Sequence, residues 1–132
     1  MTPRIKAINA YRPRLELGNT VQKAELVRAL SRATGLVEGS IEQTKMELRD
    51  HIITFSRMGR AVKVEGLGTF TPSIDLEGMF SINFRPDPAL NNGINEPGTF
   101  TGTIINSENL GMSGEEMVAK WNAEHPEEPV TE

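Results

Sequence analysis

The 132-residue chain contains no cysteine, and aromatic residues make up only 5% of it. The absence of cysteine excludes a disulfide framework, a thiolate zinc site and a cysteine nucleophile. No apolar run is longer than four residues, so the sequence predicts no membrane-spanning helix and no membrane partner. The N-terminal residues lack the apolar core of a secretory signal, so we expect a cytoplasmic protein.

Groups that exchange protons near neutral pH are also scarce, because the chain has only two histidines, His51 and His125. His51 falls within a predicted helix beside Asp50, and adjacent helical residues point about 100° apart, so the two cannot orient each other. Two histidines without the spacing of metal ligands do not match a zinc site. The sequence therefore predicts a non-enzymatic protein with no metal, no cofactor and no small-molecule substrate.

The charge of the chain is unevenly distributed, although the net value is only −4. Residues 1–63 hold 12 Lys/Arg and 6 Asp/Glu, whereas residues 64–132 hold 2 and 12. One interpretation is a basic surface beside an acidic extension. The other is that solvated charges cluster by chance, and the charge pattern alone does not decide between them.

Hydrophobic periodicity predicts two helices in the first half of the chain. Residues 4–17 precede them and mix apolar and charged residues, which favours an N-terminal strand. Asn19 or Thr20 is expected to cap the first helix, which ends at Gly35. The second helix runs from about residue 40 to 58 and is apolar on two sides. It therefore needs two partners: either a second copy of the chain or the sheet that follows covers the second side.

After residue 59 the hydrophobic period changes from 3.6 to 2, which predicts a three-stranded meander with a tight turn at Glu77-Gly78. A further strand is expected near residues 100–104. Ser113 begins a capping box that opens a last short helix, which His125 ends. Residues 127–132 are expected to form a loose acidic tail.

The segment Gly66-Leu67-Gly68-Thr69-Phe70 lies between two predicted strands. It lacks the lysine and the following helix of a phosphate-binding loop, so it does not indicate a nucleotide site. Two glycines at a strand-to-strand corner are typical of a bend where another backbone approaches closely.

The context of this corner resembles the HU and integration-host-factor family of bacterial histone-like DNA-binding proteins. Four segments carry the resemblance: Lys23-Ala-Glu-Leu26, Thr34-Gly35-Leu36, Arg57-Met-Gly59 and the corner motif Gly66, Gly68, Thr69, Phe70. They correspond to the family's K-x-E-L, T-G-L, K/R-x-G and G-F-G-T-F segments, and residues 23–70 fit without a gap. The resemblance covers somewhat over a third of the chain.

The resemblance implies an α+β, HU-like fold in an intertwined homodimer. We expect one domain over residues 1–132, with a family-like core over about 19–90 that contains two helices and a three-stranded antiparallel sheet. An N-terminal strand extension (1–18) and an acidic C-terminal extension (91–132) with a strand and a helix are additions. In the family, long basic arms embrace DNA, and a proline at each tip wedges into the minor groove. Here Asp75 and Glu77 occupy the arm position, so the arm is shortened and strong bending is not expected.

The sequence therefore predicts a nucleoid-associated homodimer that binds double-stranded DNA weakly through its backbone, without sequence specificity. The expected DNA-binding residues are the cations Arg57, Arg60, Lys63, Arg85, Arg12 and Arg14. The alternative is an HU-fold structural or protein-interaction module that has lost DNA binding. A sequence-specific helix-turn-helix regulator is disfavoured, because residues 37–40 offer poor base-reading side chains.

Overall fold

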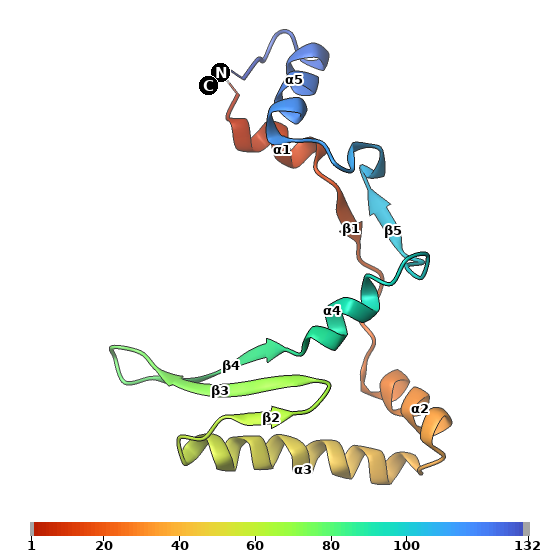
Figure 1. Cartoon of the computed structure of the whole chain (residues 1–132), viewed down its shortest axis with the longest axis vertical. Coiled ribbons are helices and arrows are strands. Elements are labelled where there is room, and N and C mark those ends of the chain that lie inside the picture. The colour runs from red at the N-terminus through yellow and green to blue at the C-terminus, as the bar shows by residue number, and fades with distance from the viewer. Residues whose placement is uncertain (1, 131–132) are drawn as a thin grey trace. The chain divides into compact units, whose positions relative to one another are not determined.

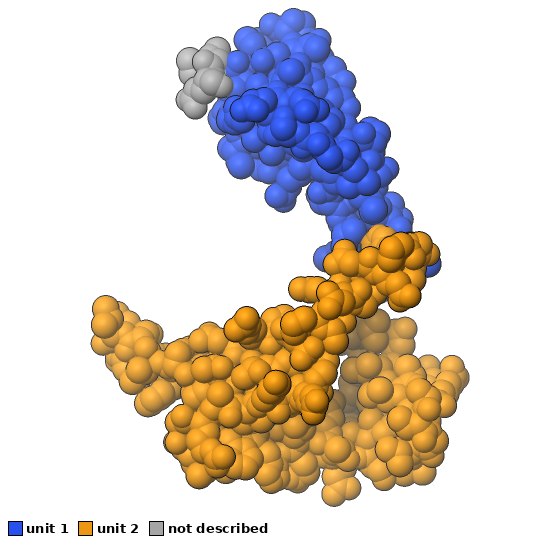
Figure 2. Space-filling view, in the orientation of Figure 1, with its two compact units in different colours: residues 1–19, 101–132 blue, residues 20–100 orange. Residues whose placement is uncertain are grey.

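The computed structural model describes residues 2–130 and shows a mixed α+β chain (Figure 1). These residues contain five α-helices and two antiparallel sheets. The chain divides into two compact units (Figure 2): unit 1 joins residues 1–19 to 101–132, and unit 2 contains residues 20–100. Unit 2 thus contains the predicted family-like core, whereas most of both predicted extensions belongs to unit 1.

Unit 1 is built from the two ends of the chain. Helix α1 (Arg4–Tyr11) packs against α5 (Gly114–Glu124). Strands β1 (Arg14–Glu16) and β5 (Thr103–Ile105) pair antiparallel, and a 3₁₀-helix, η1 (Ser107–Asn109), follows β5. The core of the unit contains Ala7, Trp121 and Val130, and Tyr11 and Val118 pack against it.

The predicted N-terminal strand is wrong over residues 4–11, which form α1, and correct only over residues 14–16. Ala7 is completely buried in the core that also contains Trp121, a contact that local hydrophobic alternation cannot reveal. Pro13 explains why the helix stops, because the residue before a proline is driven out of the helical region. Arg12 accordingly has an extended backbone (φ −64°, ψ 142°), and β1 begins two residues later.

The predicted loose tail is also wrong as far as Val130; residues 131–132 lie outside the described residues. The Val130 N–H donates to Asn122 Oδ1 (2.7 Å), and the indole Nε1–H of Trp121 donates to the Glu128 carbonyl (2.8 Å). Lys6 lies 4.0 Å from the Glu128 carboxylate. The basic N-terminal and acidic C-terminal segments therefore pack together within one unit. The predicted start of the last helix at Ser113 is confirmed, because the Ser113 side chain caps the helix by accepting from the Glu116 N–H (3.1 Å).

In unit 2, helix α2 (Lys23–Thr34) packs against α3 (Glu38–Arg57). Gly35 ends α2 in the left-handed region (φ 77°), as predicted. The predicted cap at Asn19 or Thr20 is wrong, because α2 starts at Lys23 after Gln22, and Gln22 makes no side-chain cap hydrogen bond. Residues 19–20 precede Gln22, the N-cap residue, and their side chains are too far away to reach the free N–H groups of the first helical turn.

The meander of unit 2 is confirmed and has the strand order β2-β3-β4. Its strands are β2 (Val62–Val64), β3 (Gly68–Ile74) and β4 (Phe80–Pro86). Helix α3 contacts β2 and β3, and Figure 1 shows it running alongside the strands. A short helix, α4 (Pro88–Ile94), follows β4 and is capped by the Asp87 carboxylate, which accepts from the Ala89 N–H (2.9 Å).

The corner between β2 and β3 depends on Gly68, which has a φ of +156°. A Cβ at this position would lie 2.5 Å from the Arg85 carbonyl oxygen and 2.5 Å from the Phe84 ring. Both neighbours belong to β4, so the absent side chain lets β3 and β4 approach at the corner. The rings of Phe70 and Phe84 then pack with their centroids 4.8 Å apart.

We predict that Gly68→Ala destabilises the fold by about 1–3 kcal/mol, the usual effect of overpacking, because backbone and ring must move to admit the methyl group. Gly39→Ala is the matched control, because Gly39 lies in α3 with nothing within 4 Å of an added Cβ. Urea unfolding followed by circular dichroism measures both. Equal stability of Gly68→Ala and the parent chain would contradict the close approach.

A second prediction concerns Tyr11, the only tyrosine of the chain, whose hydroxyl donates a hydrogen bond to Glu124. Burial, and next this hydrogen bond, raise the pKa of Tyr11 to about 12. Because folding raises this pKa, its contribution to stability is complete below about pH 10 and is lost as the pH rises through about 12. We expect absorbance titration to show Glu124→Gln lowering the pKa and Glu127→Gln leaving it unchanged. A parent pKa near 10 would refute this.

Candidate functional site

The three-stranded sheet of unit 2 has one polar and one apolar face, because successive residues of a strand point to opposite sides. Lys63 is in register with Thr69, and Thr69 is in register with Arg85, so these three form one row across the sheet. The same side carries two more cross-strand pairs, and we call it the polar face. Its members are Lys63, Thr69, Thr71, Ser73, Ser81, Asn83 and Arg85.

The opposite, apolar face lies on the side where α3 packs. Its members are Val62, Val64, Phe70, Pro72, Ile74, Phe80, Ile82 and Phe84. Near its inner end, Val62, Val64 and Phe70 are half-buried, whereas all of β4 is exposed. Helix α3 therefore covers only part of this face.

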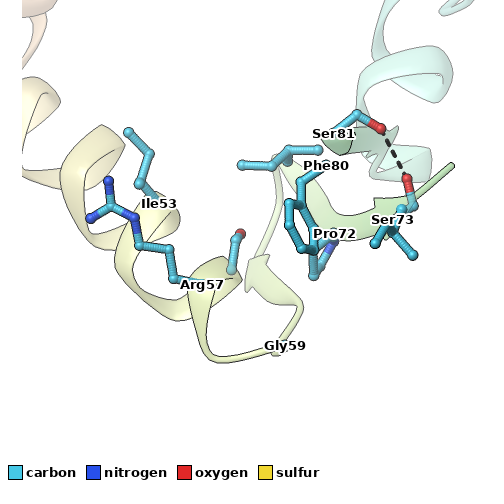
Figure 3. Close-up of a pocket in the computed structure, with 10 residues that line it drawn as sticks. Ile53, Arg57, Gly59, Pro72, Ser73, Phe80 and Ser81 are labelled. Carbon is cyan, nitrogen blue, oxygen red and sulfur yellow. Dashed lines mark hydrogen bonds between the residues drawn. The ribbon is translucent and has the colours of Figure 1, made fainter. Parts of the chain in front are cut away.

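A hollow of about 780 Å³ lies where the end of α3 diverges from the β3–β4 hairpin. Figure 3 shows Ile53 and Arg57 on its helix side and Pro72 and Phe80 on its strand side. The hydroxyl of Ser56, which also lines it, is buried and has no hydrogen-bond partner among the described residues. The hollow extends the uncovered part of the apolar face.

The polar face is a surface of hydroxyl and amide groups with cations at one end. Ser73 and Ser81 share a hydrogen bond of 3.0 Å, and the Asn83 side-chain amide donates to the Ser73 hydroxyl (3.1 Å). These contacts hold the outer side chains in place. Hydroxyl, amide and basic side chains of this kind are the groups that donate to phosphate oxygens in protein–DNA complexes.

The structure places only two of the six predicted DNA-binding cations on the polar face. Lys63 and Arg85 are exposed on the polar face, separated by one strand and hence by about 10 Å. Arg57 instead lines the hollow, and the Arg60 guanidinium lies 5.3 Å from the centroid of the Phe55 ring. Arg12 and Arg14 belong to unit 1, where Arg12 ends α1 and Arg14 pairs in register with Ile105.

Charge alone did not reveal the hydroxyl and amide members of the polar face. The predicted binding residues do not include four members of this face: Thr71, Ser73, Ser81 and Asn83. Strand alternation starting from Lys63 and Arg85 places these four residues on the same face. Of the corner motif, Gly66 (φ 82°) lies in the turn, Gly68 begins β3, Thr69 is on the polar face and Phe70 is on the apolar face.

The hairpin turn explains one of the two acidic residues at the arm position. The Asp75 carboxylate accepts from the N–H groups of Glu77 and Met79, both at 2.9 Å. Its backbone N–H also donates to the Met79 carbonyl (3.0 Å), so the strands reverse within a few residues. The short predicted turn is confirmed, and no Lys or Arg lies between residues 64 and 84.

Other kinds of site find no support in the part of the chain that the structure describes. Residues 2–130 contain no group of three or more His, Asp or Glu side chains that could hold a metal ion. None of the helices in this range is long and apolar enough to cross a membrane.

Comparison with known proteins assigns no family to the chain: no protein-family model and no curated protein sequence matches it. The polar face is an exposed surface of unit 2 that combines cations with hydroxyl and amide groups.

We predict that Asp75→Ala destabilises the hairpin by about 1 kcal/mol, because two turn N–H groups lose their acceptor. Amide exchange of Glu77 and Met79 should accelerate in the same variant, as measured by NMR. Glu77→Ala is the control, since it removes a neighbouring carboxylate without removing the acceptor. Unchanged exchange in Asp75→Ala would show that the carboxylate does not hold the turn.

Proposed function

We propose that the chain is a non-enzymatic DNA-binding protein with an HU-like fold. It acts as a homodimer and contacts the backbone of double-stranded DNA through the polar face. The observation that carries the proposal is the row of Lys63, Thr69 and Arg85 in register on one side of the sheet, with both cations exposed. Backbone contacts position a protein without reading bases, so binding has no sequence specificity.

The positions of the family-like segments support an HU-like fold. Thr34-Gly35-Leu36 lies at the junction of α2 and α3, and Arg57-Met-Gly59 lies at the end of α3. The G-x-G-T-F segment forms the corner from β2 to β3. On this proposal the protein acts on the bacterial nucleoid in the cytoplasm.

The incomplete core of unit 2 supports a homodimer. Among residues 20–100, the large apolar side chains that are buried are only Val27, Ile41 and Ile52. On the apolar face, Phe80 is 75% exposed and Phe84 is 45% exposed. Large apolar side chains in such numbers at the surface mark an interaction site.

The total exposed area of the chain also supports a homodimer. The chain exposes 10326 Å². Two separate compact globules of 51 and 81 residues, the sizes of the two units, would expose about 8,200 Å² together. The excess is about 2,000 Å² per copy, or about 4,000 Å² for two copies. Obligate homodimers bury about 2,000–5,000 Å² from both copies combined. A second copy therefore supplies an interface of suitable size.

The charge of the polar face sets the strength of binding. Each copy presents Lys63 and Arg85 there, so a dimer offers four cations to phosphates. Unit 2 as a whole holds nine Lys/Arg and ten Asp/Glu, which lowers affinity relative to a strongly basic protein. The hairpin has no cation beyond Arg85, so we expect weak binding with little bending.

The second candidate is an HU-fold interaction module that does not bind DNA. The hairpin tip favours it, because Asp75 and Glu77 flank the fully exposed Leu76, and Ile74 and Met79 are exposed beside them. An apolar tip flanked by carboxylates is suited to a protein surface and repels phosphate. The two candidates share the fold and the dimer and differ in what the polar face binds.

Titration of a fluorescently labelled duplex at several salt concentrations separates the candidates. We predict that anisotropy shows binding near 50 mM salt that weakens steeply as salt rises. The double variant Lys63→Ala/Arg85→Ala should reduce the slope of log K against log salt by about 2 for each copy in contact with DNA. Arg28→Ala/Arg32→Ala removes the same charge from α2 and should change the slope less.

A folded parent chain that does not bind the duplex near 50 mM salt would contradict DNA binding and favour the interaction module. Equal effects of the two double variants would show that binding depends on net charge and not on the polar face.

A further inference from the structure

The outer edge of β4 carries unused backbone hydrogen-bonding groups within unit 2. Antiparallel strands alternate between hydrogen-bonded and non-hydrogen-bonded residue pairs. At the two ends of the β3–β4 ladder, the Asp75 N–H donates to Met79 (3.0 Å) and the Asp87 N–H donates to Leu67 (2.9 Å). Odd-numbered residues of β4 therefore direct their N–H and C=O groups toward β3. Even-numbered residues direct theirs outward.

The residues with outward groups are Phe80, Ile82, Phe84 and Pro86. The first three present both an N–H and a C=O at the edge, and Pro86 presents only a C=O. In the strand order β2-β3-β4, no strand of unit 2 covers this side. Three donors and four acceptors are thus available in one line along a seven-residue strand.

The free part of β3 beyond the end of β2 is protected against pairing, whereas the β4 edge is not. Beyond the end of β2, β3 has an exposed edge, and Pro72 lies there in register with Ile82 at a position where an N–H would point outward. Proline at such a position prevents another strand from pairing. On β4, no proline precedes Pro86 and no lysine is present. The contrast indicates that the β4 edge is kept available for pairing.

We propose that β4 pairs antiparallel with β4 of a second copy, about a two-fold axis at Asn83, and joins the two sheets into one of six strands. The inference rests on the homodimer of the proposed function and specifies its contact. In this register Ile82 lies opposite the partner's Phe84, and Phe80 lies opposite the partner's Pro86. Ser81 lies opposite the partner's Arg85, so no like charges meet.

The sequence of β4 is complementary to itself in this register, which favours a second copy over an unrelated strand. Every pair joins residues of equal parity, so the apolar face stays apolar and the polar face stays polar across the junction. Each of the three outward N–H groups of one copy can donate to an outward carbonyl of the other copy. Phe80 donates to the partner's Pro86, Ile82 to the partner's Phe84, and Phe84 to the partner's Ile82. A contact in which each surface meets its own copy is the usual two-fold interface.

The pairing also has a consequence for the polar face. The strand order becomes β2-β3-β4-β4-β3-β2, so the Lys63–Thr69–Arg85 rows of both copies lie on one continuous surface. The hydroxyl and amide groups of the hairpins extend that surface on both sides of the junction. Both copies can then contact the phosphates of the same duplex.

Disulfide trapping tests the register, and the chain's lack of cysteine makes single substitutions unambiguous. At the two-fold axis, the Asn83 residues of the two copies form a non-hydrogen-bonded pair with Cα atoms about 4.5 Å apart, within disulfide reach. Asn83→Cys should cross-link under mild oxidation. Thr71, opposite Asn83 on β3, is also exposed, but in Thr71→Cys the two copies of this residue lie about 15 Å apart by strand spacing and should not cross-link.

A second pair of variants tests the edge hydrogen bonds directly. Ile82→Pro and Ile82→Ala both remove the side chain, but only proline also removes the outward N–H, and it leaves the ladder to β3 intact. Sedimentation should show the dimer of Ile82→Pro dissociating at a concentration at least tenfold higher than that of Ile82→Ala.

The outcomes distinguish this inference from the proposed function. Cross-linking at Asn83→Cys at least tenfold faster than at Thr71→Cys supports β4 pairing. A chain that sediments at twice its 14.6 kDa mass but cross-links equally at both positions overturns β4 pairing and leaves the homodimer. A chain that stays monomeric at tens of micromolar overturns both, and anisotropy with the duplex then shows whether the monomer binds DNA.

Discussion

The two-residue alternation of β3 and β4 is the constraint on which the rest of unit 2 depends. It places apolar side chains such as Phe70, Phe84 and Ile82 on one side of the sheet and hydroxyl, amide and basic side chains on the other. A shift of either strand by one residue would mix the two sets, so the register must be held at both ends. Gly68 holds the corner end by allowing close approach, and Asp75 holds the turn end by accepting two N–H groups.

The same alternation links folding to the proposed function. Helix α3 covers only part of the apolar face, so a single copy leaves aromatic side chains exposed, and this exposure supports the proposed homodimer. The polar face is exposed at all of its members except the half-buried Thr69, so it is accessible to a ligand whose chemistry matches donors and cations. On the proposed function, DNA meets the polar face, and pairing of the β4 edges joins the polar faces of two copies into one surface. The acidic C-terminal segment packs with the basic N-terminal segment in unit 1, and Lys6 near Glu128 is one such contact.

Local sequence signals predicted much of this fold correctly. Gly35 and the apolar periodicity located α2 and α3, the change of period located the meander, and Ser113 located the start of α5. The failures share a physical cause: contacts between residues distant in sequence. Ala7 is helical and buried in a core with Trp121, 114 positions away, which local alternation cannot show. The binding site is predicted only in part from the sequence. Positive charge alone places Arg12 with cations of the other unit, whereas the alternation of strand residues places hydroxyl side chains on the same face as Lys63.

The proposed function requires that DNA contacts the protein through the polar face. Titration of the isotopically labelled protein with a short duplex, followed by NMR chemical shifts at low salt, measures this residue by residue. If DNA binds the polar face, the largest shifts fall on polar-face residues such as Lys63, Thr69, Asn83 and Arg85, and shifts across unit 1 are small. Shifts confined to unit 1, to α2, or to the hairpin tip around Leu76 would contradict it.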